Sequence, residues 1–473
     1  MRILINFPWQ IALLCCISLT AGCSDSDSGP ALPAWEDAPC ETVSSLNQYD
    51  GLMSRWKEQT DAAPFEAGRM VFTGSSSIRF WEQLQEDLSP WAPIQRGFGG
   101  AISWNLVEYI DETIIRHDPA AVVIFVGTND IAVDLGPTVV VDSYRCIVET
   151  VAQELGDDVS IHYIAITPTP LRWDQWSEAN QANEEIAALA SQWRGLHFID
   201  TSPAFLATGE PPAADLFISD GLHLSDAGYA IWAEEIREHL EATVPKFSAV
   251  FDPLEPGTTL LVDLGPGNPE DGLLAPSPDG FGRHWNSWHP VEANTLLSSG
   301  EHLGSLVTTS GEATSLRLTF SGATKFSAGL RDGGLLDPSE AFLGDLAVPE
   351  ATADFLYVSA TGTVLVGRGS LTFEGLDPDA SLQLRLFASR AGLEMETVVY
   401  RVSGAGAPQS RTLNSSGDEL ASGDGFAGNQ DTVVMFEGLA ADTSGRLHVD
   451  FEPQGGALGS TASLALIELK IVP

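Results

Sequence analysis

The sequence predicts an α/β domain on a doubly wound parallel sheet, followed by an all-β sandwich or jelly-roll domain. Two observations carry this prediction. Short apolar runs alternate with helical patterns from residue 40 to 245, and beyond that point the helical patterns nearly vanish. At 473 residues the chain exceeds one ordinary hydrophobic core, so two domains are expected.

The N-terminal part carries short apolar runs with β-branched residues, as buried parallel strands do. The expected strands are 70–73, 93–96, 121–126, 161–166 and 196–200. Helices are expected at 77–88, 104–116, 138–155, 178–194 and 225–240, the last with Ser225 as its N-cap. This alternation favours a doubly wound sheet, whose sites form at the carboxyl ends of its strands.

The C-terminal part has the sequence pattern of an antiparallel β protein. Short alternating runs such as Ser381-Leu-Gln-Leu-Arg-Leu-Phe387 lie between turn residues. We expect the α/β domain over 40–245, a proline-containing linker over 246–258 and the sandwich over 259–473. Trp285 and Trp288 could offer aromatic faces to a sugar or could be core residues of the sandwich.

The N-terminus has the pattern of an export signal. An apolar run over 11–19 follows Arg2 and is too short to span a bilayer. Leu19-Thr-Ala-Gly-Cys23 resembles the lipobox of bacterial lipoproteins. That resemblance implies a signal peptide over 1–22, lipidation of Cys23 and a tether over 23–39; an ordinary signal peptide cleaved nearby is the alternative. Ser24 after the cysteine resembles outer-membrane sorting, so we expect an exported protein with a lipid anchor in the bacterial envelope.

Composition limits the partners. Asp and Glu number 65 against 23 Lys and Arg, a formal net charge of −42, which argues against nucleic acid as a partner. Cys40 and Cys146 remain after export, in a compartment where disulfides persist, and could form a bridge if their geometry allows it. The chain has no CxxC or HExxH motif, so no metal is expected, and no cofactor.

Gly74-Ser-Ser-Ser77 lies where an apolar strand would pass into a helix. A serine there is commonly only an N-cap. The same position also suits chemistry, because free backbone N–H groups and the positive helix end stabilise an alkoxide and then an oxyanion. Such a serine still needs a base, since its hydroxyl is a poor nucleophile at neutral pH.

Asp220-Gly-Leu-His223 can supply that base. The histidine can take the serine proton while the aspartate holds the imidazole tautomer. Alone, the pair could equally be a turn-forming aspartate and a solvated histidine. Asn129 and Gly100, each in a loop after an expected strand, are ordinary turn residues that could also donate hydrogen bonds to an oxyanion.

Taken together, these segments resemble the SGNH, or GDSL-like, hydrolase family over residues 66–243. The nucleophile block falls on Gly74-Ser75-Ser76, the glycine block on Arg96-Gly-Phe-Gly-Gly100, the asparagine block on Gly127-Thr-Asn129 and the last block on Asp220-Gly-Leu-His223. The resemblance implies a flavodoxin-like sheet and a serine esterase. Ser76, Asp220 and His223 would be catalytic, and Ser76, Gly100 and Asn129 would form the oxyanion hole.

One position departs from the family pattern. Ser75 stands where the family usually has aspartate, so the hydrogen bonding of this turn must differ. Ser75 and Ser77 also compete with Ser76 as the nucleophile, although the alignment of the blocks favours Ser76. The departure leaves open a catalytically inactive surface glycan-binding protein, and the same triad would also support an acyltransferase.

The substrate is less well defined. Arg172, Trp173 and Trp176 follow the fourth expected strand and could shape a sugar or acyl pocket, or the tryptophans could pack a loop. No apolar lid segment is apparent, which favours a short acyl ester or an acetylated carbohydrate over a long-chain triglyceride. The C-terminal domain loosely resembles galactose-binding and malectin-like jelly rolls, which implies a possible carbohydrate-binding role.

Overall fold

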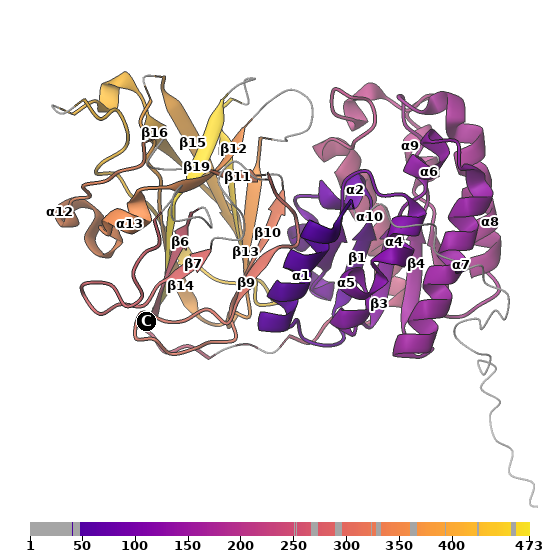
Figure 1. The fold of residues 1–473 in the computed structure, drawn as a ribbon, viewed down its shortest axis with the longest axis horizontal. Coiled ribbons are helices and arrows are strands. Elements are labelled where there is room, and N and C mark those ends of the chain that lie inside the picture. The colour runs from indigo at the N-terminus through magenta and orange to yellow at the C-terminus, as the bar shows by residue number, and fades with distance from the viewer. Residues whose placement is uncertain are drawn as a thin grey trace, which may run out of the picture.

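The computed structural model describes residues 40, 48–249, 251, 253–265, 273–288, 296–322, 324–327, 333–359, 367–392, 394–422, 425–455 and 460–473. The expected signal peptide, the tether and Cys23 lie outside these residues. Figure 1 shows an α/β domain, drawn from indigo to magenta, beside a β domain, drawn from orange to yellow.

The α/β domain is built on one five-stranded sheet of order β2-β1-β3-β4-β5. Every neighbouring pair in it is parallel. Its strands are β1 (Met70–Gly74), β2 (Ile94–Gly97), β3 (Ala121–Phe125), β4 (Ser160–Ile164) and β5 (Leu196–Ile199). The order is that of a flavodoxin-like doubly wound sheet, so the predicted fold of this domain is confirmed.

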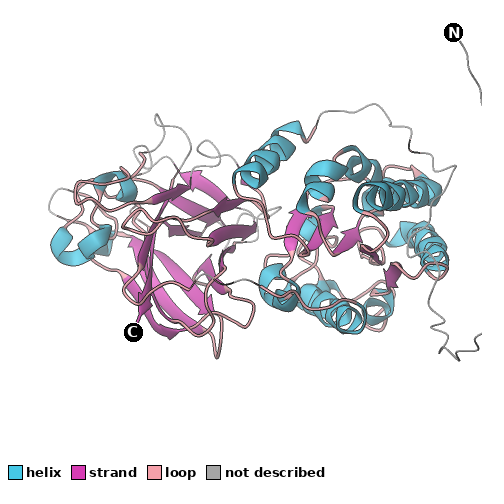
Figure 2. Ribbon diagram, turned by 90° about the horizontal axis from the view of Figure 1, so that it is seen from below, coloured by secondary structure: helices cyan, strands magenta, loops and turns pink. Residues whose placement is uncertain are grey.

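Helices cover both faces of this sheet, as Figure 2 shows. The longer ones are α1 (Asp50–Ala62), α7 (Gly136–Leu155), α8 (Trp176–Ala190) and α10 (Asp226–Thr243). The shorter ones are α2 (Ser76–Arg79), α3 (Leu84–Asp87), α4 (Ser103–Glu108), α5 (Ile110–Thr113), α6 (Thr128–Ala132) and α9 (Ser202–Leu206). The side chain of Ser225 accepts from the N–H of Gly228, which confirms the predicted N-cap of α10.

The helix expected over 77–88 is wrong as a single element, because the structure divides it into α2 and α3. The side-chain amide of Gln95 donates hydrogen bonds to the carbonyl oxygens of Ile78 and Trp81 at the break. A residue from β2 thus satisfies carbonyls that a continuous helix would have bonded internally. The helix over 104–116 is likewise divided, into α4 and α5.

The central strands of the sheet are buried on both faces, which explains the continuous apolar sequence of β3. Along β3, Val122 and Ile124 belong to one hydrophobic cluster and Val123 and Phe125 to the other. Neighbouring side chains of a strand point to opposite faces, so each face needs its own apolar partner layer.

The β domain contains three sheets that are almost entirely antiparallel. Their strand orders are β16-β15-β18-β13-β10-β9, β19-β12-β11-β8 and β17-β14-β20-β6-β7. The strands are β6 (Thr259–Leu264), β7 (Asn286–Trp288), β8 (Leu296–Leu297), β9 (His302–Gly304), β10 (Arg317–Gly322), β11 (Thr324–Ser327), β12 (Phe355–Ser359), β13 (Gly369–Glu374), β14 (Ser381–Phe387), β15 (Glu396–Ser403), β16 (Gln409–Ser416), β17 (Val434–Leu439), β18 (Leu447–Pro453), β19 (Thr461–Leu464) and β20 (Leu466–Val472). Two short helices, α12 (Glu340–Leu343) and α13 (Pro349–Thr352), interrupt this series.

One hydrophobic core joins the three sheets of the β domain. Phe320, Leu384 and Leu464 come from different sheets and are all fully buried in it. This packing is that of a β-sandwich, as the sequence predicts. Trp285 and Trp288 are 4% and 3% exposed, so both are core residues rather than an exposed platform for a sugar ring.

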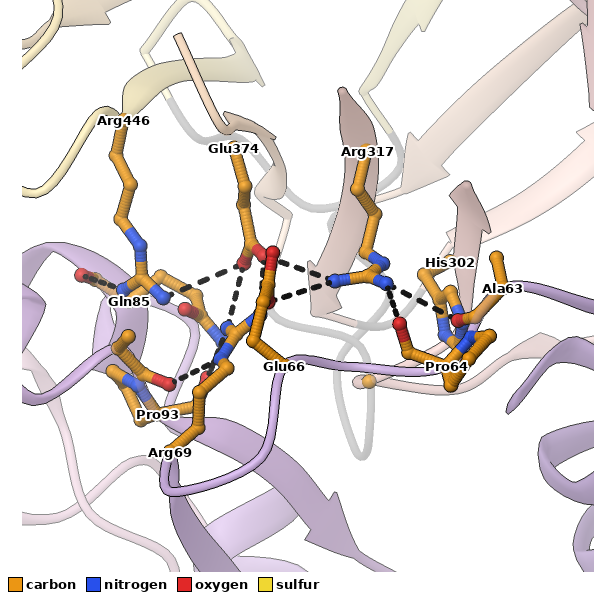
Figure 3. A network of polar contacts seen from close by, with 12 residues as sticks. Ala63, Pro64, Glu66, Arg69, Gln85, Pro93, His302, Arg317, Glu374 and Arg446 are labelled. Atoms are coloured by element: carbon orange, nitrogen blue, oxygen red, sulfur yellow. Dashed lines mark hydrogen bonds and ion pairs between the residues drawn. The ribbon is translucent and has the colours of Figure 1, made fainter. Parts of the chain in front are cut away.

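A buried ion-pair network joins the two domains, as Figure 3 shows. Glu374 of β13 binds Arg69, which directly precedes β1, at 2.8 Å, and lies 3.5 Å from Arg446 and 3.8 Å from Arg317. Arg317 also donates to the carbonyl of Pro64 at 2.6 Å. The domains are thus fixed to one another by charged hydrogen bonds that water does not reach.

The charge of Glu374 is stabilised by this network. Burial alone would raise its pKa, but the charges of Arg69 and Arg446 outweigh that effect and hold the pKa well below its ordinary value. Glu374 therefore stays ionised in the folded protein.

Candidate active site

The candidate nucleophile lies in a sharp turn between β1 and α2. Gly74 ends β1 with a φ of +141°, and a Cβ placed there would lie 2.0 Å from the carbonyl oxygen of Phe125. Only glycine fits this turn. Ser76 is the first residue of α2, so its hydroxyl emerges at the carboxyl edge of the sheet.

The structure brings Ser76, His223 and Asp220 into one hydrogen-bonded chain. Ser76 Oγ lies 2.8 Å from His223 Nε2, and His223 Nδ1 lies 2.6 Å from Asp220 Oδ2. The other oxygen of Asp220 accepts from the backbone N–H groups of Leu222 and His223 at 2.8 and 2.9 Å. A serine, an imidazole and a carboxylate in this order are what nucleophilic acyl transfer requires.

The electrostatics of Asp220 suit an ionised partner for the imidazole. Burial raises its pKa, but the hydrogen bonds from His223 and Leu222 have the larger combined effect and lower it below the ordinary value. The ring of Phe80 packs edge-on against the His223 ring with centroids 4.9 Å apart, which limits rotation of the imidazole.

The geometry separates the three neighbouring serines. Ser76 alone among them has its hydroxyl within hydrogen-bond distance of His223. Ser75 is fully buried, and its Oγ has no hydrogen-bond partner among the described residues. The backbone carbonyl of Ser77 accepts a hydrogen bond from the hydroxyl of Tyr229 on α10 at 2.8 Å, which fixes the turn to that helix.

Ser75→Ala is expected to leave the protein as stable as the wild type or up to about 1–2 kcal/mol more stable. The substitution removes a buried hydroxyl that makes no hydrogen bond in the described structure. Urea unfolding of the two proteins measures this difference. A loss of more than about 1 kcal/mol would show that the Ser75 hydroxyl has a partner in solution.

The two predicted oxyanion donors lie in loops beside this turn. Gly100 has a φ of +77°, and the hydroxyl of Tyr49 donates to the carbonyl of Gly99 at 3.0 Å, which holds the loop. Asn129 is the second residue of α6, and its side-chain N–H donates to the carbonyl of Ala101 at 2.9 Å. That bond links the asparagine loop to the glycine loop and leaves the second amide hydrogen of Asn129 available.

Arg172 contacts the asparagine loop directly. Its guanidinium donates to Asn129 Oδ1 at 3.0 Å and to Thr128 Oγ1 at 2.8 Å. The first bond fixes the orientation of the side-chain amide, because the oxygen faces Arg172 and the nitrogen faces the other way. These contacts position Asn129, and the substrate-binding role that the sequence suggested for Arg172 stays a prediction.

Arg172→Ala is expected to lower kcat for a small ester by about 10–100-fold while KM changes little. The substitution frees the Asn129 amide to rotate but removes no contact with a small acyl group. Steady-state kinetics with p-nitrophenyl acetate separates the two parameters. A large rise in KM with kcat unchanged would instead assign Arg172 to substrate binding.

Asp130 is a supporting residue to which sequence reasoning gave no role. Its fully buried carboxylate accepts from the N–H of Ser103 at 3.0 Å and from the Ser103 hydroxyl at 2.6 Å. This pair joins α6 to the start of α4 and so sets the distance between Asn129 and the Gly100 loop. The only signal in the sequence was its place directly after Asn129.

Trp173 and Trp176 lie half-buried beside a shallow polar depression rather than against the serine. Trp176 begins α8 and packs in part on the core of the α/β domain. The two tryptophans therefore take no part in the hydrogen bonds that connect Ser76, His223 and Asp220. Their role in substrate binding stays a prediction.

Cys40 and Cys146 form a disulfide, with their Cα atoms 5.3 Å apart. The bridge ties the segment before α1 to the middle of α7. The sequence left open whether these two cysteines are free or bridged, and in the structure they are bridged. No helix in the described part of the chain is long and apolar enough to cross a membrane.

A five-stranded parallel sheet of order β2-β1-β3-β4-β5 with flanking helices defines this domain as an SGNH hydrolase fold. Residues 18–231 match the model of the GDSL-like lipase/acylhydrolase family, so this part of the chain is similar to that family. A comparison with curated proteins finds no match.

Several solved structures are similar to the chain at low identity. A GDSL-like lipase from Bacteroides thetaiotaomicron is 21% identical with a TM-score of 0.37, over 41% of this chain and 99% of that one. A lipase/acylhydrolase from Enterococcus faecalis is 21% identical with a TM-score of 0.31, over 38% and 100%. An acetylxylan esterase from Geobacillus stearothermophilus is 16% identical with a TM-score of 0.32, over 37% and 96%.

Proposed function

We propose that this protein is a serine esterase that hydrolyses carboxylic esters through Ser76, His223 and Asp220. The observation that carries the proposal is the hydrogen-bonded chain from Ser76 Oγ through the imidazole to Asp220, with distances of 2.8 and 2.6 Å. Both bonds lie in the range from which proton transfer to the imidazole can proceed.

In the first half of the reaction, Ser76 Oγ attacks the ester carbonyl carbon and its proton passes to His223 Nε2. The backbone N–H groups of Ser76 and Gly100 and the side chain of Asn129 receive the oxyanion. The carbon–oxygen bond to the alcohol then breaks, and His223 returns the proton to the departing alcohol.

In the second half, His223 takes a proton from water, and the resulting nucleophile attacks the acyl group on Ser76. The acid leaves when the bond to Ser76 Oγ breaks and the imidazole returns its proton to the serine. Asp220 stays ionised throughout and stabilises the imidazolium that forms twice in the cycle.

A cavity of about 320 Å³ beside Phe80 supports a small substrate. Phe80 lies in its wall and also contacts the His223 ring, so the cavity and the catalytic residues are neighbours. Glu82, Asp226 and Arg368 supply polar groups to the wall, and Arg368 comes from the β domain. This volume is at the lower end of small-molecule pockets.

Of the acidic side chains in the cavity wall, that of Glu82 is suited to hydrogen bonding with hydroxyl groups. Burial raises the pKa of Glu82 well above its ordinary value, which favours the protonated carboxyl, a hydrogen-bond donor. Its Oε1 atom has no partner among the described residues. We infer that the alcohol part of the substrate is a sugar and the acyl part is short.

Acetyl esters are expected to be cleaved at least about tenfold faster, in kcat/KM, than octanoyl esters of the same alcohol. The cavity volume limits the length of the acyl chain that it can hold. Acetate release from an acetylated polysaccharide, compared with p-nitrophenyl esters of rising chain length, measures this preference. Faster cleavage of the octanoyl ester would rule out the short-acyl assignment, and transfer to an added alcohol in place of water would assign an acyltransferase.

A further inference from the structure

Three histidines meet on the face of the sheet that α10 covers. His162 lies on β4, His197 is its direct partner on the neighbouring β5, and His239 lies near the end of α10. The same face carries Ile164 and Ile199, which belong to an apolar cluster with residues of α10. The histidines thus occupy positions where the pattern of the fold calls for apolar side chains.

The cluster is separate from the candidate active site. His223 lies three residues before α10, at the carboxyl edge of the sheet, whereas His239 is within the last turns of that helix. Because α10 runs back along the sheet, the histidines lie toward the opposite edge. None of the residues assigned to ester hydrolysis contributes to the cluster.

The nitrogen atoms of the three rings converge. One ligand nitrogen from each ring lies within 4.8 Å of the others, and His162 Nδ1 is 3.0 Å from His239 Nε2. In a tetrahedral site with metal–nitrogen distances of about 2.0–2.1 Å, ligand nitrogens lie roughly 3.3–3.4 Å apart. His162 and His239 need a shift of a few tenths of an ångström. The His197 ring, stacked on His162 with centroids 4.4 Å apart, has to rotate out of that stack to direct a nitrogen at the same ion.

The surroundings favour the form of imidazole that binds metals. His162 Nε2 lies 2.9 Å from the hydroxyl of Ser160, so a proton on Nε2 leaves the lone pair of Nδ1 pointing at His239. Histidine ligands of metals commonly donate their second N–H in this way.

Access and exchange are also possible at this position. His162 is fully buried, whereas His197 and His239 are only half-buried. β5 is the edge strand of the sheet, so one side of the cluster faces solvent. A fourth ligand position can therefore be filled by water.

We propose that His162, His197 and His239 bind one Zn²⁺ ion, with water as the fourth ligand, at a site separate from Ser76. Imidazole nitrogen suits Zn²⁺ better than it suits Mg²⁺ or Ca²⁺, which prefer oxygen ligands. The ion would join the edge strand β5 to β4 and α10, and so its effect would be on the stability of the α/β domain.

The test is titration of the tag-free full chain with ZnCl₂ after removal of bound metal by a chelator. Isothermal titration calorimetry is expected to give one tightly bound Zn²⁺ per chain, and Co²⁺ is expected to give the visible absorption bands of a four-coordinate site. His197→Gln and His239→Gln should each weaken the affinity by at least about tenfold. Thermal unfolding should occur at higher temperature with Zn²⁺ in the wild type but not in either variant.

His284→Gln is the matched control, because it removes one histidine from the β domain outside the cluster. Circular dichroism establishes that the variants are folded. Wild-type affinity in both cluster variants would place the ion on the acidic surface and overturn the proposal. The absence of stoichiometric Zn²⁺ binding to the folded wild type would overturn it equally.

Discussion

Ser76→Ala lowers kcat for p-nitrophenyl acetate hydrolysis by about 10⁴-fold or more. The substitution removes the oxygen that attacks the ester and leaves His223 and Asp220 in place. Steady-state absorbance measurements at equal protein concentrations give the ratio of kcat between the wild type and the variant. The protein should remain as stable as the wild type, because a half-buried hydroxyl is the only group lost.

Ser77→Ala is the matched control for that loss. It removes the same hydroxyl from the adjacent position, while the contact of Ser77 with Tyr229 uses the backbone carbonyl and survives. We expect kcat within about threefold of the wild type. Equal activity in the wild type and in Ser76→Ala, whether high or absent, would refute the assignment of Ser76 and, if absent, favour an inactive glycan-binding protein.

Glu374→Gln is expected to destabilise the protein by about 3–5 kcal/mol. The change removes the buried carboxylate that Arg69, Arg317 and Arg446 share. Arg69 and Arg317 keep only the more exposed Glu66 as an ion-pair partner. Because these residues join the two domains, chemical unfolding should also separate into two transitions, one for each domain. Guanidinium chloride unfolding, followed by both fluorescence and circular dichroism, measures both effects.

The same residue predicts the response to acid. The folded-state pKa of Glu374 is depressed, so its contribution to stability is present above the unfolded-state pKa of about 4.5 and is lost as pH falls below that value. Glu374→Gln should abolish this part of the acid dependence. Asp61→Asn, at an exposed ion pair, should change stability much less. A similar loss in the two variants would contradict the role of the network.

The strands of the α/β domain were predictable because the central ones, β1 and β3, are buried on both faces and are therefore mostly apolar. The helices were harder to bound, since the break between α2 and α3 depends on Gln95 from a strand elsewhere in the chain. Helix α1 was not predicted. Its first turn has no side-chain capping bond that a sequence pattern could reveal.

The candidate site was predictable to the extent that it is local in sequence. Asp220 and His223 share one loop, and Ser76 follows the strand end that the fold requires. The contact of Arg172 with Asn129 and the meeting of His162 with His239 join residues that are far apart in the chain. The partners of Glu374 come from both domains, and no pattern within either domain indicates them.

The most direct test of the central claim is labelling with a fluorophosphonate, followed by mass spectrometry of the proteolytic peptides. Such reagents trap an activated serine by forming a covalent bond to its oxygen. The proposed site predicts one adduct per chain, on Ser76, and its loss in His223→Ala because the base is missing. An adduct on Ser75 or Ser77, or no adduct on the folded wild-type protein, would contradict the claim that Ser76 is the nucleophile of an esterase.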